Sequence, residues 1–161
     1  MITPEFLNEI YEYKDGNLFY KKLVHKNTKA VGDKVGYIAK SGYATTKIKN
    51  KSYLIHRLIY LMHYKYLPEQ LDHIDGNPIN NCIENLRDAS GSQNCMNKKI
   101  SAVNTSGYKN INYIKQINKY RVQLKVKGKP ISFGCYADVE LADLVAQEAR
   151  DKYFGKFARH Y

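Results

Sequence analysis

With 161 residues, of which 43% are hydrophobic and 25% charged, the chain is long enough for one domain or two small ones and does not have a disordered composition. No apolar run approaches the roughly 20 residues of a membrane span, and the N-terminus lacks the layout of a signal peptide, so we expect a cytoplasmic protein without membrane contact. Lys and Arg total 26 against 15 Asp and Glu, a net charge of +11 that favours a polyanionic partner, nucleic acid first.

The N-terminal part of the chain predicts short helices around a small antiparallel sheet. Apolar residues recur at helical spacing within residues 4–13, and a hairpin turn is expected at 14–17. Residues 24–34 are polar and basic, as in a loop. The further elements expected here are a β meander over 36–38, 43–48 and 52–55 and a buried helix over 57–64.

Residues 70–99 predict the order strand, turn, strand, helix. Gly76-Asn77-Pro78 is the expected turn, and Ser90-Gly91-Ser92 precedes a helix expected over 93–99. Residues 101–106 have the composition of a linker. The three cysteines form no CxxC pair, so we expect buried thiols rather than a disulfide framework or a structural zinc site at Cys82, Cys95 and Cys135.

The C-terminal part has the clearest periodicity. Residues 119–127 alternate, with apolar residues on one face and Lys119, Arg121, Gln123, Lys125 and Lys127 on the other. Flanking strands are expected at 108–114 and 131–136. Asp138 is the predicted N-cap of a helix with one apolar side. These elements predict a three-stranded antiparallel sheet packed on one helix.

The polar face of residues 119–127 is predicted to contact DNA. It belongs to a stretch, residues 104–137, that has seven Lys and Arg and no acid; an ordinary solvated strand face is the alternative. Arg121 and Gln123 are expected to contact base edges and the lysines to contact phosphates. From the first strand we expect further contacts by Lys109, Asn112 and Lys115.

A second basic stretch lies nearer the N-terminus. Residues 16–68 hold eleven Lys and Arg against one acid, so we expect this region to contact the DNA backbone, with Arg57 among its contacts. His56 can orient a phosphate or the active-site loop, but a hydrogen-bonded structural histidine explains it equally well.

Residues between 72 and 94 carry the groups that phosphodiester hydrolysis needs. The reaction requires a base that takes a proton from water and a cation that stabilises the phosphorus and the leaving oxygen. His73 is the candidate base, because a histidine is mostly neutral at pH 7. The oxygens of Asp72, Asn85 and Asn94 suit a hard divalent cation. Because neighbours on a strand point to opposite faces, Asp72 and His73 need a bulge or a strand end to act together.

At these residues the sequence resembles the ββα-metal (His-Me finger) motif of HNH nucleases, particularly the phage free-standing and intron-encoded kind. The resemblance implies that His73 is the general base and that Asp72 and Asn94 hold one Mg²⁺ or Mn²⁺ per active site. It also implies that Asn85 braces the hairpin and orients His73. Asn94 in place of a third-position histidine argues against Zn²⁺. The pattern matches at Asp72-His73, Asp75-Gly76-Asn77, Asn80-Asn81, Asn85-Leu86-Arg87 and Gln93-Asn94.

The C-terminal stretch is similar to the plant Apetala/ethylene-response-factor DNA-binding domain. That resemblance implies a three-stranded sheet placed in the major groove, with a helix packed behind it. Tyr120 and Ser132 stand where plant members usually carry tryptophan, so plant base preferences are not transferred. The matching positions include Gly107-Tyr108, Lys119-Tyr120, Phe133-Gly134 and Phe154-Gly155.

We therefore expect an α+β protein with a nuclease region over residues 1–100, a linker over 101–106 and a DNA-binding domain over 107–161. Within the nuclease region, a small antiparallel sheet precedes the ββα-metal motif at about 70–99. The expected function is a sequence-guided endonuclease on double-stranded DNA, of the phage homing type that nicks one strand, with no obligate protein partner. The alternatives are a non-catalytic sequence-specific DNA-binding regulator and an RNA-binding or RNA-cleaving protein, although no RNA-recognition motif is present.

Overall fold

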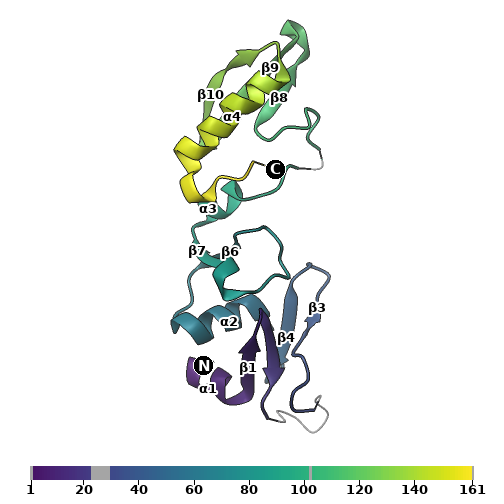
Figure 1. Ribbon diagram of the computed structural model, residues 1–161, viewed down its shortest axis with the longest axis vertical. Coiled ribbons are helices and arrows are strands. Elements are labelled where there is room, and N and C mark those ends of the chain that lie inside the picture. Colours follow the sequence, from purple (N-terminus) through teal and green to yellow (C-terminus); the bar gives the residue numbers. More distant parts are fainter. Residues whose placement is uncertain (1, 23–29, 102, 161) are drawn as a thin grey trace. The chain divides into compact units, whose positions relative to one another are not determined.

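The computed structural model describes residues 2–22, 30–101 and 103–160, so the loop expected at 24–34 lies largely outside the described residues. The chain divides into two compact units, residues 1–89 and 90–161, each with its own apolar core. Both combine short helices with small antiparallel sheets, which is an α+β architecture (Figure 1). In the described part of the chain, no helix is long and apolar enough to cross a membrane.

The first unit begins with α1 (Pro4–Ile10), β1 (Tyr11–Lys14) and β2 (Asn17–Tyr20). The hydroxyl of Thr3 caps α1 by accepting a hydrogen bond from the Phe6 backbone. The helix expected to reach residue 13 ends at Ile10, because Tyr11 pairs with Tyr20 across the β1–β2 hairpin. Helical spacing alone could not show that Tyr11 starts a strand.

The core of this unit is built by β3 (Tyr37–Ile38), β4 (Ala44–Ile48), β5 (Lys51–Leu54) and α2 (Ile55–Tyr64). The three strands form the expected meander, in the order β3-β4-β5. α2 begins at Ile55 rather than at Arg57, directly after β5. It buries Leu58 and Ile59 in a core shared with Leu7 of α1 and Leu18 of β2.

The site lies on a second hairpin of the first unit, made by β6 (Gln70–His73), η1 (Ile83–Asn85) and β7 (Leu86–Ala89). Its register sets Asp72 opposite Arg87 and His73 opposite Leu86. His73 is the last residue of β6, so the Asp72-His73 pair sits at a strand end, as expected. The long connection between the two strands, residues 74–82, can therefore fold back against His73.

The second unit contains α3 (Gly91–Met96), β8 (Ile111–Ile114), η2 (Lys115–Ile117), β9 (Lys119–Val126), β10 (Lys129–Tyr136), α4 (Val139–Phe154) and η3 (Gly155–Phe157). α3 begins two residues before the expected helix start at Gln93 and ends before residue 99. The helix starts early because Ser90 and Gln93 form a capping box. Asp138 caps α4 as expected, by accepting from the backbones of Glu140 and Leu141.

The sheet of the second unit has the order β10-β9-β8, with α4 packed along one face (Figure 1). Val122 and Leu124 of β9 are fully buried against this helix, as their alternation predicts. A bulge interrupts the pairing of β10 with β9 between Ser132 and Cys135. Gly134 occupies it with a φ of 113°, a conformation that favours glycine.

Candidate active site

His73 is held by a buried amide. Its Nε2 lies 3.0 Å from Oδ1 of Asn81, and both residues are almost fully buried. Because an amide oxygen can only accept, Nε2 carries the proton and Nδ1 is the basic nitrogen of the neutral ring. Asn81 therefore selects the tautomer in which His73 can take a proton through Nδ1. The sequence interpretation gave this orienting role to Asn85.

Asn85 braces the connection between the strands. Its Nδ2 donates to Asp75 Oδ1 at 2.9 Å and to the Asn80 carbonyl at 2.8 Å, while its Oδ1 accepts from the Asp75 backbone at 3.0 Å. Asp75 also accepts from the Asn77 backbone and the Asn80 side chain. Burial alone would raise the pKa of Asp75, but these hydrogen bonds together lower it. Asp75 is thus a turn-stabilising carboxylate, and Asn85 shapes the loop that carries Asn81.

Asp72 is paired with an arginine on the facing strand. Nε of Arg87 lies 2.8 Å and its Nη2 2.6 Å from Oδ2 of Asp72. The carboxylate side chain is 5% exposed and the arginine side chain 14% exposed. This pair gives the buried carboxylate a charge partner within the hairpin itself.

A second histidine packs behind the first. The rings of His56 and His73 meet edge to face at 5.0 Å, and Tyr43 lies against His56 with ring centroids 5.5 Å apart. Burial, followed by the nearby His73 and Arg57, lowers the pKa of His56 to about 3. His56 is therefore an uncharged interior neighbour of His73, not a surface contact for DNA. Its Nδ1 is buried and has no hydrogen-bond partner among the residues that the structure describes.

Arg57 also forms hydrogen bonds within the first unit. Its guanidinium donates to the carbonyls of Pro68 at 3.0 Å and Glu69 at 3.3 Å, the residues just before β6. The expected contact of Arg57 with the DNA backbone stays a prediction beside this structural role. The residue ties α2 to the start of the strand that carries Asp72 and His73.

The first hairpin supports the same connection from the N-terminal side. The hydroxyl of Tyr13 accepts a hydrogen bond from the Ile83 backbone at 3.1 Å. At Gly16 the backbones approach so closely that a Cβ would lie 2.8 Å from the Cys82 nitrogen. No local sequence pattern indicates this role of the hairpin, because its contacts join residues about 70 positions apart.

Three of the four expected site residues, Asp72, His73 and Asn85, lie together in the first unit, and Asn94 lies on α3 in the second. Asp72 contributes a carboxylate and Asn94 an amide oxygen, a donor chemistry that suits Mg²⁺ or Mn²⁺. No three His, Cys, Asp or Glu side chains gather as a metal cluster among the residues that the structure describes. The expected donor set contains only one such side chain.

Comparison with known proteins assigns the hairpin to a family. The family model described as HNH endonuclease matches residues 53–96. Protein 3.8 of Escherichia phage T7 is 35% identical over 89 residues, which cover 55% of this chain and 73% of that protein. Residues 53–96 are a domain of the HNH endonuclease family. The protein named "Uncharacterized HNH endonuclease L560" of Acanthamoeba polyphaga mimivirus is 34% identical over 128 residues, or 76% of this chain and 64% of that protein. No solved structure matches.

The HNH match spans the last residue pair of β5, all of α2, the β6–β7 hairpin and α3. It thus contains Asp72, His73, Asn85 and Asn94, and also His56 and Asn81. The sheet of the second unit lies outside the HNH match.

That sheet carries the candidate DNA interface. Its polar face shows a row formed by Asn112, Arg121 and Cys135, which are paired across the three strands. The next position of β9 pairs Gln123 with Ser132 of β10. Ser132 and Cys135 were not among the expected contacts, because only the bulge brings both to this face of β10.

Not every basic residue expected at this interface lies on the sheet face. Lys119 and Lys125 do, by their alternation with the buried residues of β9. Lys115 lies in η2, and Lys127 lies in the β9–β10 turn with a φ of 48°. Lys109 makes a contact inside the second unit, since its ammonium donates to the carbonyl of Met96, at the end of α3, at 2.9 Å.

The expectation of buried thiols is wrong for two of the three cysteines. Cys95 and Cys135 are exposed, and Cys82 is half-buried. All three are free thiols. Cys135 is exposed because the β10 bulge reverses the alternation that would have turned it inward.

Proposed function

We propose that this protein is a metal-dependent endonuclease that hydrolyses phosphodiester bonds in double-stranded DNA. The observation that carries the proposal is the hydrogen bond from His73 Nε2 to the buried Asn81, at a strand end beside the Asp72 carboxylate. A base with its tautomer selected in this way is what activation of a water molecule requires. The membership of residues 53–96 in the HNH family supports the same chemistry.

His73 is the general base in this mechanism. Its Nδ1 takes the proton from the water that attacks the phosphorus, while Nε2 keeps its own proton on Asn81. Asn81 stabilises the ring further once it is positively charged, because its oxygen still accepts from Nε2. Asn85 acts indirectly, by holding the loop that presents Asn81. As the water oxygen bonds to phosphorus, the bond from phosphorus to the 3′ oxygen breaks, and that oxygen takes a proton from solvent. The products are 5′-phosphate and 3′-hydroxyl ends.

Asp72 and Asn94 would hold one Mg²⁺ or Mn²⁺ ion. Such an ion stabilises the charge that develops on the phosphate and on the leaving oxygen. Asp72 would offer its carboxylate beside or in exchange for Arg87, which now neutralises it. One base and one cation site per chain are enough to cut one strand, so a single protein molecule would nick.

The sheet of the second unit would select the target. Its three strands with one helix behind support the similarity to the Apetala/ethylene-response-factor domain. We propose that Arg121, Gln123 and Asn112 contact base edges and that Lys119 and Lys125 contact phosphates. A homing-type enzyme encoded by a phage, working in the cytoplasm of the host cell, would need this combination of a target-selecting domain and a nicking site. The phage and viral relatives support that setting.

A nicking assay on supercoiled plasmid tests the proposal. The wild type is expected to nick with Mg²⁺ or Mn²⁺, and His73→Ala is expected to lose at least about a hundredfold in rate while binding DNA equally well. His63→Gln, on the exposed side of α2, is the matched control and should nick like the wild type. Nicking by His73→Ala at the wild-type rate would rule out the assigned base.

The ion pair between Asp72 and Arg87 favours one second candidate, a non-catalytic DNA-binding regulator. A carboxylate already neutralised by an arginine has less need of a cation. The same assay separates the two functions: a regulator would bind one duplex sequence preferentially and leave the plasmid intact with every divalent metal tried. Binding of the duplex and of an RNA of the same sequence, measured at several salt concentrations, tests the alternative of an RNA-binding protein.

A further inference from the structure

The short helix α3 is attached to the core of the second unit. The side chain of Met96, its last residue, packs against the apolar cluster formed by β8, β9 and α4. Its first residues are held by the Ser90–Gln93 capping box. A helix of this length has little stability of its own, so its position depends on these packing and capping contacts.

The end of α3 is held by Lys109. The ammonium of Lys109 donates to the Met96 carbonyl at 2.9 Å, one of the carbonyls that a helix leaves unsatisfied at its C-terminus. The lysine is half-buried, and its pKa falls to about 8 through burial and through the positive charges of Arg150 and Arg159. An ammonium placed among two guanidinium groups is unfavourable there unless an acceptor compensates it, and the Met96 carbonyl is that acceptor.

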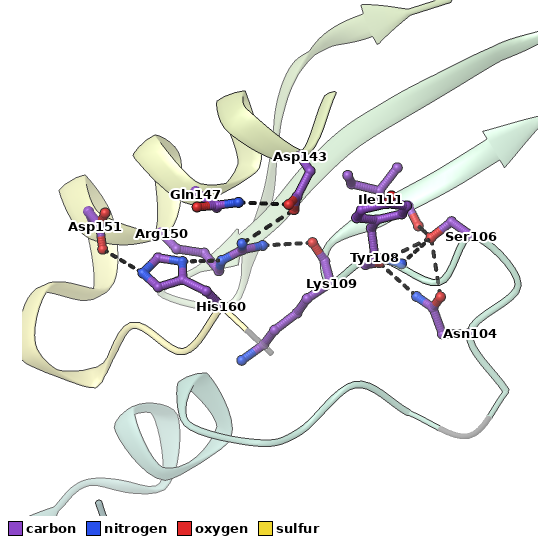
Figure 2. Close-up of polar contacts among 10 residues, drawn as sticks. All are labelled: Asn104, Ser106, Tyr108, Lys109, Ile111, Asp143, Gln147, Arg150, Asp151 and His160. Carbon is purple, nitrogen blue, oxygen red and sulfur yellow. Dashed lines mark hydrogen bonds and ion pairs between the residues drawn. The ribbon is translucent and has the colours of Figure 1, made fainter. Parts of the chain in front are cut away.

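The backbone carbonyl of Lys109 is held by a buried arginine of α4. Nη1 of Arg150, which is fully buried in α4, donates to the Lys109 carbonyl at 2.7 Å. Asp143 lies 3.6 Å from Arg150 Nη2, and His160 accepts from its Nε at 3.3 Å. Figure 2 shows the consequence: the Lys109 carbonyl faces Arg150, while its amine extends the opposite way. One residue thus connects α4 to α3.

We propose that Lys109 is a positioning residue for Asn94: together with Arg150 it holds α3 on the DNA-recognition unit, so that the sheet that selects the target and the amide that binds the cation belong to one structural body. The proposal rests on the proposed function for the role of Asn94, but not for the anchoring of α3. It replaces the expected phosphate contact of Lys109.

Three lysine variants of the full chain test the anchor. Lys109→Met keeps the aliphatic stem and removes the donor, and Lys109→Arg keeps a donor and its charge. A cavity of about 450 Å³ bordered by Cys95, Met96 and Lys109 gives the longer side chain room. Lys152→Met is the matched control, because it removes the same charge from an exposed position on α4.

The first readout is hydrogen exchange of backbone amides without metal or DNA. Lys109→Met is expected to speed exchange at the Asn94 and Asn97 amides, which bond to Ser90 and Gln93, about tenfold. In Lys109→Met, the amides of β9 and α4 should keep their protection from exchange. Lys109→Arg should restore most of the protection of the α3 amides. Lys152→Met should leave the exchange of all these amides unchanged. Unchanged α3 exchange would overturn the proposal. So would faster exchange throughout β9 and α4, which would assign Lys109 to the stability of the whole unit.

The second readout is the Mg²⁺ concentration for half-maximal nicking. Lys109→Met is expected to raise it about tenfold, as for residues that orient a metal ligand from behind. The salt dependence of DNA binding should stay the same, whereas loss of a phosphate contact would lower the slope by about one. A lowered slope with an unchanged Mg²⁺ requirement would return Lys109 to the DNA interface. Absence of nicking in the wild type would refute the proposed function but leave the exchange result intact.

Discussion

Arg87 binds the carboxylate of Asp72 from the facing strand, with Nε 2.8 Å and Nη2 2.6 Å from the same oxygen, Oδ2. The residues are also cross-strand partners in the β6–β7 ladder. The hairpin therefore brings its own positive charge to the carboxylate proposed as a cation ligand. This relationship makes stability and cation binding depend on each other.

Arg87→Met is expected to lower the free energy of unfolding by about 3 kcal/mol in the absence of metal, because it removes the guanidinium that pairs with the buried Asp72 carboxylate. Added Mg²⁺ should stabilise this variant more than the wild type, since an ion that binds only the folded state takes over the neutralising role. Thermal unfolding with and without Mg²⁺ measures both effects. Equal stabilisation of the two proteins by Mg²⁺ would argue that Asp72 is not a cation ligand.

Asn81→Ala is expected to slow the cutting step about 10- to 100-fold, because it removes the acceptor that selects the His73 tautomer. Affinity for DNA should not change, since Asn81 is buried. Single-turnover nicking, with DNA binding measured in parallel, separates the two. Asn77→Ala, an exposed asparagine of the same connection, is the control. A rate loss shared by both variants would point to general disorder of the loop.

Gly16→Ala is expected to destabilise the protein by about 1–3 kcal/mol, because its φ of 74° is strained for alanine and its Cβ would meet the Cys82 backbone. Gly32→Ala provides the comparison: its φ is 90°, but nothing lies within 4 Å of the added atom. Urea unfolding of the two variants isolates the cost of the collision from that of the strain. If both lose the same stability, the close approach of the hairpin to the loop contributes nothing.

Arg121→Ala and Gln123→Ala are expected to reduce the preference for the target over unrelated duplexes, each by about 1–3 kcal/mol of discrimination. Lys125→Ala should weaken binding to all sequences alike and reduce the salt dependence. Competition binding against a panel of duplexes gives both quantities. If Arg121→Ala weakened binding to all duplexes equally, Arg121 would be assigned to the phosphate contacts.

The titration of Lys109 predicts a pH dependence of stability. Its pKa is about 8 in the folded chain, below the ordinary 10.5, so between these values the unfolded chain holds a proton that the folded chain has released. Stability from this group therefore rises as pH increases from about 8 to 10.5. The difference in unfolding free energy between the wild type and Lys109→Met should grow over this window, and other titrating groups cancel in the difference. A flat difference would mean that the lysine keeps its ordinary pKa.

The pattern of the sequence predicted the elements that have a period or a turn signal. The alternation around Val122 and Leu124 gave β9, and the strand, turn, strand, helix order around His73 was correct in outline. Tyr11 was assigned to a helix because it follows Leu7 at helical spacing, and only its partner Tyr20 decides for a strand. The bulge of β10 could not be predicted from the periodicity of apolar residues.

Spacing predicted that Asp72 and His73 of the candidate site lie together at a strand end, but it could not predict which side chains contact them. Asn81 and Asn85 are the same residue type four positions apart, and no period distinguishes the one that reaches His73. Lys109 was expected at the DNA because a lysine in a basic stretch has the same local sequence whether it faces solvent or binds a helix end. The contact of Asn81 with His73 and that of Lys109 with Met96 both depend on tertiary packing.

The bulge in β10 also bears on how target preference can change over generations. β10 is an edge strand, paired only with β9, so a substitution, insertion or deletion around Gly134 leaves the central strand and its buried Val122 and Leu124 in place. The residues that such a change would alter, Ser132 and Cys135, stand beside Gln123 and Arg121. In the proposed function, the surface that would select the target could therefore change along its edge strand while the central strand and the fold stay the same.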